Sequence, residues 1–443
     1  MTFSRKAALR RFLSPVAMIA VAGIGMTAVS APAAAQKKEK PAPAPKANYS
    51  KGFVAAYKPV ETQVNGASPD YAAIKAALPG LVAASQTPDD RAATGRLMFT
   101  VGQQLKDPAT SLQGAEMVLA SGRTDAVQTG QFNMVAAQLA YNLKDYAKTR
   151  SYSEAAIKAG YTENEPELLL AESYFAQNDY TGGLKYLGDT IAARKAANQP
   201  VNEAWVKRAL ATAYNNQMND EARRWALMYA SEYPNQSSWG DAIAIAINTG
   251  DYQPAEMLDL LRLARLTNTM RTRAQFLEYV DAADPRKLPQ EVVTVLDAGV
   301  SAKLVDNSIQ AVKDARATAA ARLAADKAEL PALQRDASAA GAKLVTVMAA
   351  ADTMLSYGKY AEAETFYAKA AALPGANAPL VLTRQGIAQV EQGKFAEAQA
   401  TFAKVQGVRQ SIASLWALYA TQKAKGTVIQ PAPATASAVG AAQ

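Results

Sequence analysis

The chain has 443 residues, a formal net charge of +8, and no cysteine and no histidine. Without those two residue types it can form no disulfide, no thiolate nucleophile, no imidazole base and no Cys- or His-ligated zinc or haem site. Carboxylate and Ser/Lys chemistry remain possible, but no calcium loop or P-loop appears, so we expect neither a metal site nor a cofactor. The length suffices for two or three ordinary domains or for one long solenoid of repeats.

Residues 1–35 have the three-part pattern of a secretory signal peptide. Basic residues between positions 5 and 11 precede an apolar run at 16–26, and the small residues at 33–35 form a cleavage pattern. The apolar run is shorter than the roughly 20 residues that span a bilayer, which favours a cleaved signal over the alternative, an uncleaved membrane anchor. We therefore expect an exported, periplasmic protein that is cleaved near Ala35.

Segments of biased composition lie on either side of the body of the chain. Residues 36–49 are rich in Pro, Ala and Lys, which is typical of an extended linker, and residues 425–443 are expected to form a disordered tail. Without the basic residues of the signal peptide and the linker, the body carries a net charge of about +1. Such a body lacks the basic surface that nucleic-acid binding requires, so no nucleic-acid partner is expected.

Short motifs recur in this body with a spacing near 34 residues, which is typical of arrays of helical repeats. Lys-Asp-Tyr at 144–146 recurs 34 residues later as Asn-Asp-Tyr at 178–180, and Gly-Asp-Tyr at 250–252 is a further copy. Gly-Lys-Tyr-Ala-Glu-Ala at 358–363 recurs 35 residues later as Gly-Lys-Phe-Ala-Glu-Ala at 393–398. Each copy lies between two apolar stretches with helical spacing, so the repeat unit is predicted to be a pair of helices.

These motifs resemble the tetratricopeptide repeat (TPR) family, whose pattern is W-x2-L-G-x2-Y followed by A-x3-F, A and P. The matching positions are Leu170, Ala171, Tyr174, Ala222, Pro234, Trp239, Ala363, Tyr367, Ala370, Ala398 and Phe402. The resemblance implies an all-α fold, a solenoid of antiparallel helical hairpins wound into a right-handed superhelix. Small residues then lie between the two helices of a hairpin, and a left-handed Gly or Asn ends the first helix. The alternative is an unrelated helical bundle.

The repeat pattern also sets the expected domain boundaries. Residues 50–299 are expected to form the N-terminal repeats and residues 344–424 a C-terminal repeat pair with a capping helix, which includes the apolar stretch 412–419. The Ala-rich residues 300–343 lack a hairpin motif until Leu330-Pro331 and are expected to form a long helical connector, built as a pair of helices.

A first candidate site follows from the resemblance, because the first helix of each hairpin lines the concave surface in the family. Counting back from each turn gives the expected peptide- or protein-binding residues Gln138, Tyr141, Asn142, Glu172, Phe175, Arg208, Asn215, Asp241 and Asn248. Amides that recur at one place in successive helices can hydrogen-bond an extended peptide backbone. The alternative is ordinary solvated polarity on an exposed helix face.

A second candidate site is basic. Arg262, Arg265, Arg271 and Arg273 lie in a stretch without an acidic residue, and they are expected to contact an anionic surface such as lipid headgroups, a cell-wall polymer or an acidic partner. The alternative is a solvated face beside buried leucines.

The one spacing that suggests catalysis is Ser-x-x-Lys at 356–359, which falls in the turn of a repeat and has no Lys-Thr-Gly partner. We therefore expect no enzyme and no catalytic residue. The expected function is that of an exported scaffold or adaptor that binds a protein or peptide on its concave surface. The alternatives are an accessory protein in cell-envelope polymer assembly or export, in contact with the polymer or with membrane-associated machinery, and a regulatory subunit of an envelope enzyme.

Overall fold

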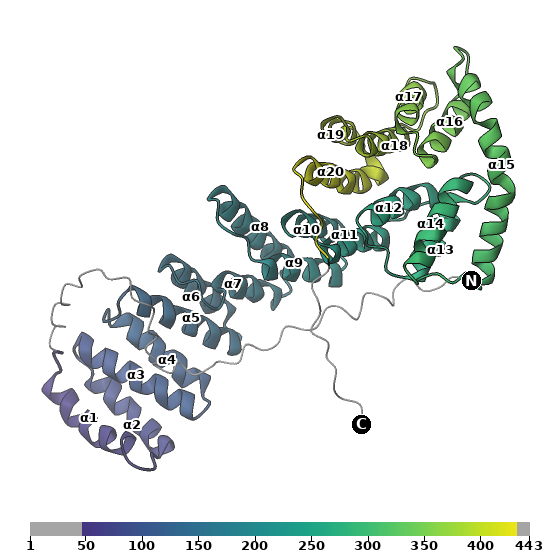
Figure 1. Ribbon diagram of the computed structural model, residues 1–443. Helices are drawn as coiled ribbons and strands as arrows, with labels where there is room; N and C mark the ends of the chain where they lie inside the picture. Colours follow the sequence, from purple (N-terminus) through teal and green to yellow (C-terminus); the bar gives the residue numbers. More distant parts are fainter. Residues whose placement is uncertain (1–46, 432–443) are drawn as a thin grey trace, which may run out of the picture. The chain divides into compact units, whose positions relative to one another are not determined.

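The computed structural model describes residues 47–431 (Figure 1). Twenty α-helices follow one another in this range, and its one paired extended segment is an isolated bridge between Asn235 and Gln430. The expected all-α fold of consecutive, TPR-like helical hairpins is confirmed. Within the same range, none of the helices is long and apolar enough to cross a bilayer. The expected signal peptide, linker residues 36–46 and tail residues 432–443 lie outside the described residues.

The chain divides into two compact units between Pro200 and Val201. We call residues 47–200 the N-terminal unit and residues 201–431 the C-terminal unit. The division falls inside the range 50–299 that the sequence marks as one array of repeats.

Four hairpins make up the described part of the N-terminal unit, and each helix packs on the next one along the chain. The helices are α1 (Lys51–Val64), α2 (Tyr71–Ala84), α3 (Pro88–Gln104), α4 (Pro108–Ala120), α5 (Ala126–Asn142), α6 (Tyr146–Lys158), α7 (Pro166–Phe175) and α8 (Tyr180–Ala196).

The turn inside three of these hairpins has one repeated geometry. A residue with positive φ ends the first helix, and the aspartate after it accepts hydrogen bonds from the first turn of the second helix. The backbone N–H of that aspartate donates to the carbonyl five residues back, at 2.8–3.0 Å, as in a Schellman cap. The residue pairs are Lys106-Asp107, Lys144-Asp145 and Asn178-Asp179. The constant sequence signal of this turn is therefore the aspartate, whereas the left-handed residue varies.

Helices α3 and α4 approach so closely that only glycine fits at their contact. A Cβ on Gly95 would lie 2.7 Å from the carbonyl oxygen of Gly114, and a Cβ on Gly114 would lie 2.4 Å from the backbone nitrogen of Phe99. Real Cβ atoms do not approach backbone atoms this closely, so these glycines set the separation of the hairpin.

The C-terminal unit contains three hairpins, a long helix, two further hairpins and a final helix. The helices are α9 (Glu203–Asn215), α10 (Asn219–Glu232), α11 (Gln236–Thr249), α12 (Pro254–Leu266), α13 (Arg273–Ala283), α14 (Pro289–Ser301), α15 (Gln310–Ser338), α16 (Leu344–Ser356), α17 (Tyr360–Ala371), α18 (Ala378–Glu391), α19 (Phe395–Phe402) and α20 (Gln410–Ala424), with a short 3-10 helix, η2 (Gly407–Arg409), before the last.

The connector differs from the expectation of two helices, because α15 is one continuous helix of 29 residues. Pro331 lies inside it on an exposed face, where water can satisfy the carbonyl left free by the missing N–H. The alanines around this proline have high helix propensity, so the proline does not end the helix.

The two hairpins after α15 follow the predicted repeat pattern closely. Gly358 and Gly393 end α16 and α18 with φ of 71° and 76°, in the left-handed region. Ala363 and Ala398 are fully buried at the helix contacts, as the pattern predicts. The earlier copy at 250–252 departs from it, because Gly250 has φ of −96° and α12 begins only at Pro254. Gly250 therefore does not form the left-handed turn that we expected there, and Tyr252 packs over it at the place where a Cβ would lie.

The last helix folds back onto the middle of the chain. Helix α20 packs on α18 and α19, as expected of a capping helix, and also on α10, α11 and α12 (Figure 1). Trp239 of α11 meets Tyr419 edge-to-face, with ring centroids 6.0 Å apart, and its Nε1 donates to the side chain of Gln422 at 3.1 Å. The amide of Gln422 donates in turn to the carbonyl of Ala230 at 2.8 Å. Because α20 contacts both the last hairpin and helices α10–α12, the helices from α10 to α20 form a closed ring, which we call the circuit of helices.

Part of the expected disordered tail belongs to this closure. The backbone of Gln430 accepts a hydrogen bond from Gln236 at 2.8 Å and donates one to Pro234 at 3.1 Å. Thr427 is also bonded, through its N–H, to the carbonyl of Gln422 at 2.8 Å. Thr427 is thus held by the end of α20 and Gln430 by the α10–α11 turn, so the expectation of disorder from residue 425 is wrong for this part of the tail.

Candidate functional site

The expected binding stripe lies on both units, so its two parts are described separately. In the N-terminal unit Gln138, Tyr141 and Glu172 are half-buried and Asn142 is exposed. Phe175 is only 6% exposed and packs against Gly183, where a Cβ would meet its ring at 2.3 Å. Phe175 is therefore a packing residue of the α7–α8 hairpin and not a surface contact, which corrects its assignment to the stripe.

In the C-terminal unit the stripe residues lie along α9 and α11. Asn215 and Asn248 are exposed at the ends of these helices, and Arg208 and Asp241 are half-buried. Burial raises the pKa of Asp241, while Arg271 and Lys207 oppose the shift. These two cations therefore lie near Asp241, so this stretch presents mixed charge and not a ladder of amides alone.

The four arginines of the expected basic patch do not share one surface. Arg271 and Arg273 are exposed, and Arg265 is half-buried. Arg262 is only 4% exposed and forms ion pairs with Asp259 at 2.9 Å and with Glu291 at 2.7 Å. Its role is therefore structural. No acidic residue follows Arg262 before Glu278, but Asp259 lies one helical turn before it. Glu291 lies on α14, and α13 packs on both α12 and α14.

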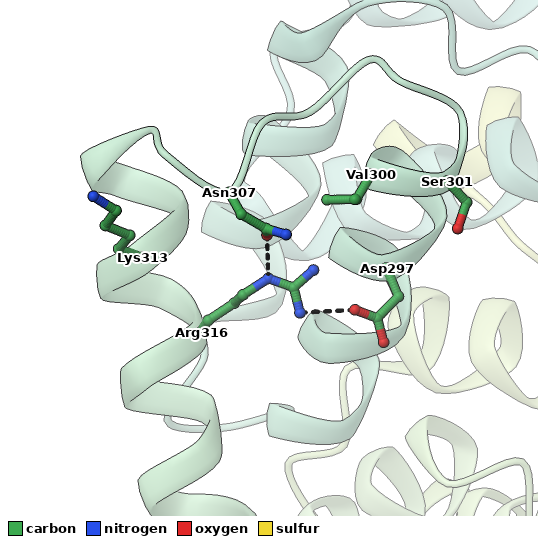
Figure 2. Close-up of a pocket in the computed structure, with 6 residues that line it drawn as sticks. All are labelled: Asp297, Val300, Ser301, Asn307, Lys313 and Arg316. Carbon is green, nitrogen blue, oxygen red and sulfur yellow. Dashed lines mark hydrogen bonds and ion pairs between the residues drawn. The ribbon is translucent and has the colours of Figure 1, made fainter.

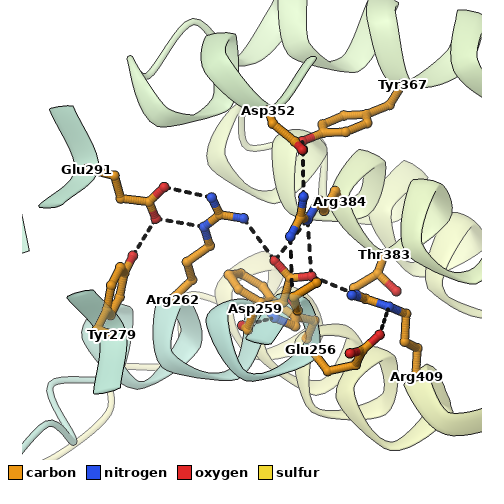
Figure 3. A network of polar contacts seen from close by, with 12 residues as sticks. Glu256, Asp259, Arg262, Tyr279, Glu291, Asp352, Tyr367, Thr383, Arg384 and Arg409 are labelled. Atoms are coloured by element: carbon orange, nitrogen blue, oxygen red, sulfur yellow. Dashed lines mark hydrogen bonds and ion pairs between the residues drawn. The ribbon is translucent and has the colours of Figure 1, made fainter. Parts of the chain in front are cut away.

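A buried ionic network surrounds Asp259, which is fully buried in α12 (Figure 3). Its carboxylate accepts hydrogen bonds from Arg262 at 2.9 Å, from Arg384 of α18 at 3.3 Å and from Arg409 of η2 at 2.7 Å. The backbone carbonyl of Asp259 accepts a further bond from the indole of Trp416, at 3.0 Å. The carboxylate of Asp259 thus joins α12 to α18 and to η2, and its backbone carbonyl joins α12 to the final helix α20.

Each arginine of the network has a second acidic partner. Arg262 is held by both oxygens of Glu291 at 2.7 Å, Arg384 bonds to Asp352 at 2.8 Å and Arg409 bonds to Glu256 at 3.0 Å. Burial tends to raise the pKa of the Asp259 and Glu291 carboxyls, but the surrounding arginines outweigh it, so both pKa values lie below their usual range. These carboxylates therefore stay charged, and the network serves to hold the fold closed.

A different cluster lies on the surface of the N-terminal unit, and we call it the Tyr/Arg cluster: Tyr141, Tyr146, Arg150, Tyr174 and Gln177. The rings of Tyr141 and Tyr146 meet edge-to-face with centroids 5.6 Å apart. The guanidinium of Arg150 lies over the ring of Tyr174 at 4.7 Å and donates to Gln177 at 2.8 Å. The tyrosines and Arg150 are half-buried and Gln177 is exposed, so rings and cation lie at the surface of α5, α6 and α7.

The groove between α14 and α15 is closed by its own side chains (Figure 2). It has a volume of about 530 Å³, and Arg316 crosses it with hydrogen bonds to Asp297 at 2.7 Å and to Asn307 at 2.9 Å. These two bonds attach Arg316 of α15 to α14 and to the segment between the two helices, so they anchor the first turns of α15 on α14.

The Ser-x-x-Lys spacing does not form a catalytic pair. Ser356 is the last residue of α16, Gly358 is left-handed, and Lys359 is the N-cap of α17, so the serine and the lysine do not share a helix face. Across residues 47–431, no group of three or more acidic side chains has the arrangement of a metal site.

No family model matches this chain, and no curated protein matches it in sequence. Among solved structures, the chain is similar to that of Naa15/Naa10 bound to HypK-THB, at 12% identity and a TM-score of 0.27, over 79% of this chain and 62% of that one. It thus spans less than two thirds of that structure's length. It is also similar to the APC/C hetero-tetramer Cut9-Hcn1, at 12% identity and a TM-score of 0.24, over 75% of this chain and 68% of that one.

Sequence reasoning identified Tyr141 as a site residue but missed Arg150 as its neighbour. Tyr146 and Tyr174 were assigned to the repeat pattern and therefore to packing. The signal that was available is the spacing of Tyr146 and Arg150, which lie four residues apart and so share a face of α6. The contact of Arg150 with Tyr174 depends on the packing of α6 on α7, which the sequence of a single helix does not reveal.

Proposed function

We propose that this chain is an exported scaffold or adaptor that binds a protein or peptide on its hairpin array, with the Tyr/Arg cluster of the N-terminal unit at the centre of the contact. Tyrosine and arginine supply most of the binding energy in many protein interfaces, because a large rigid ring and a planar cation bury much area at little entropic cost. The half-buried rings and cation on α5–α7 are the single observation that carries this proposal.

The arrangement of the cluster favours binding over a purely structural role. Arg150 stacks on Tyr174 but forms no ion pair with a described carboxylate, so its charge is available to an acidic group of a partner. The amides Gln138 and Asn142 lie on the same helix as Tyr141 and can bond to the backbone of an extended segment.

The test is a crosslinking pull-down from the envelope fraction, with the full chain as bait and affinity then measured by calorimetry. The double variant Arg150→Ala, Tyr174→Ala should weaken binding of the recovered protein at least ten-fold, as expected of a hot spot. Arg96→Ala, an exposed arginine of the same unit, is the matched control and should bind normally. Undiminished binding by the double variant, or recovery of a polysaccharide in place of a protein, would reject the proposal.

Export is tested separately by mass spectrometry of the mature protein, which should begin at or near Gln36. A chain that keeps Met1 in the cytoplasm would contradict the proposed localisation.

A further inference from the structure

A cavity of about 420 Å³ lies inside the circuit of helices in the C-terminal unit. Helices α12, α13 and α14 form one wall, and α15, the turn between α16 and α17, and α18 form the opposite wall. The two walls are adjacent because the C-terminal hairpins fold back onto α12. The cavity therefore depends on the contacts of α18 and α20 with α12. Its volume falls within the range of small-molecule sites, roughly 300–1,000 Å³.

Two half-buried charged groups in this cavity have no ion-pair partner among the residues that the structure describes. Arg265 lies one turn beyond Arg262 on α12, and Glu391 lies near the end of α18 on the other wall; both are half-buried. Within residues 47–431, Arg265 forms no ion pair with a carboxylate and Glu391 forms none with a cation. By contrast, Arg262 and Glu291, which also line the cavity, are joined by two hydrogen bonds of 2.7 Å.

The electrostatics of the two groups are consistent with this geometry. Burial raises the pKa of Glu391, and Arg265 opposes the shift. Burial alone would lower the pKa of Arg265, but Tyr279 and Glu391 outweigh it, so the guanidinium stays charged. Each group thus feels the other through space without forming a contact, and each has lost part of its water.

The remaining lining restricts which ligand fits. Val295, Leu355 and Ile387 provide an apolar surface, and Lys327, exposed on α15, is the one other charged group beside the pair formed by Arg262 and Glu291. A ligand with only negative charge would be repelled by Glu391, and one with only positive charge by Arg265. A ligand that carries both charges compensates both desolvated groups at once.

We propose that this cavity binds a small zwitterion, a free amino acid or a dipeptide, with its carboxylate on Arg265, its ammonium on Glu391 and its apolar side chain against Val295, Leu355 and Ile387. This small-molecule site is independent of the proposed scaffold function, because it lies in the other unit and uses none of the Tyr/Arg cluster.

The experiment titrates the full chain by calorimetry with L-alanyl-L-leucine, with its N-acetylated form and with its C-terminal amide. The free dipeptide should bind, and each blocked form should bind about ten-fold more weakly or worse, since each lacks one charge-assisted contact. No binding of the dipeptide at millimolar concentration, or equal binding of all three probes, would overturn the proposal without any variant being made.

Two variants then assign the contacts. Arg265→Gln should remove the preference for the dipeptide over its amide, and Glu391→Gln should remove the preference over the acetylated form. The matched controls Arg273→Gln and Glu397→Gln change exposed residues that do not line the cavity and should keep both preferences. If either cavity variant keeps the preference that it should lose, while its tryptophan fluorescence reports a folded unit, the assignment is wrong.

Discussion

The two units contain similar hairpins, but different contacts hold those hairpins together. In the N-terminal unit each helix packs mainly on its neighbours in the sequence, such as α3 on α4 and α5 on α6. In the C-terminal unit Asp259 bonds to Arg384 and Arg409, which lie 125 and 150 residues further along the chain. A linear array gains stability from one repeat to the next, whereas long-range contacts couple distant hairpins. We therefore expect the N-terminal unit to unfold in local steps and the C-terminal unit to unfold as one.

The chain provides a direct way to observe this difference. All 4 tryptophans belong to the C-terminal unit, at positions 205, 225, 239 and 416, and each is at most 2% exposed. Tryptophan fluorescence therefore reports the unfolding of that unit alone. Hydrogen exchange measured on peptides from α3–α6 reports the N-terminal unit.

The largest effect is expected from Asp259→Ala, which removes the hub of the buried network. Three buried arginines then lose a carboxylate partner, and breaking a buried pair in this way costs about 3–5 kcal/mol. Urea unfolding followed by tryptophan fluorescence should show this loss, while hydrogen exchange in α3–α6 stays unchanged. Asp251→Ala, an exposed aspartate just before α12, is the control. A loss below about 1 kcal/mol for Asp259→Ala would show that the network does not hold the closure.

A smaller and strictly local effect is expected from Gly95→Ala in the N-terminal unit. The added methyl group would lie 2.7 Å from the carbonyl oxygen of Gly114, and such overpacking costs about 1–3 kcal/mol. Gly80→Ala is the matched control, because no atom lies within 4 Å of the new Cβ and alanine favours the helix. Hydrogen exchange in α3 and α4 should become faster for Gly95→Ala only. The unfolding midpoint measured by tryptophan fluorescence should stay the same for both variants. A parallel shift of the fluorescence transition would argue against independent units.

The smallest effect is expected from Asp107→Asn at the start of α4, and it should be present at neutral pH and disappear at acid pH. Hydrogen bonding from Lys75 and from Thr110 holds the pKa of Asp107 below its usual range. As the pH falls, Asp107 is therefore protonated in the unfolded chain before it is protonated in the folded one. The stabilisation of the fold by the ionised carboxylate is complete above the ordinary aspartate pKa of about 3.9 and is lost as the pH falls below it. Asparagine caps helices about as well as aspartate, so the variant loses only the charge interaction with the half-exposed Lys75 and should be less stable than the wild type by about 1 kcal/mol or less at pH 7.

The measurement is the pH dependence of hydrogen-exchange protection in α3 and α4, from pH 7 to pH 3. Protection in the wild type should fall in the acid range, and Asp107→Asn should show a shallower fall. Identical acid slopes for the two proteins would exclude a contribution of Asp107 to the acid sensitivity of this unit.

Local features of the fold were predicted well where one short stretch of residues determines them. The glycines at 358 and 393 have the left-handed conformation, and the alanines five residues later are buried, because turn geometry and helix contact depend on residues only a few positions apart. The Gly-Asp-Tyr copy at 250–252 was misread because Tyr252 occupies the space beside Gly250 and its hydroxyl bonds to Ser411 of α20 at 2.6 Å. That partner lies 159 residues away, beyond the reach of any local pattern.

The candidate sites show the same limit. Arg262 and Arg265 are three residues apart on one helix and look alike in the sequence. Both line the same cavity, yet Arg262 is buried in ion pairs and Arg265 is half-buried and forms none with the described residues. Trp239 matches the tryptophan of the repeat pattern, but its indole bonds to Gln422 of the final helix. In both cases the surroundings are supplied by hairpins that are remote in the chain.

The sequence by itself determined that this protein is a succession of helical hairpins without cysteine or histidine chemistry, because helical periodicity, turn residues and small contact residues all act over one or two turns. Only the tertiary structure decided which hairpins meet. The return of α20 onto α10–α12 brings Asp259, Arg384 and Arg409 together, and with them the wall of the cavity that holds Arg265 and Glu391. A buried charge is stable only where opposite charges surround it, so the network requires α12, α14, α16, α18 and η2 together, and no single hairpin can hold it.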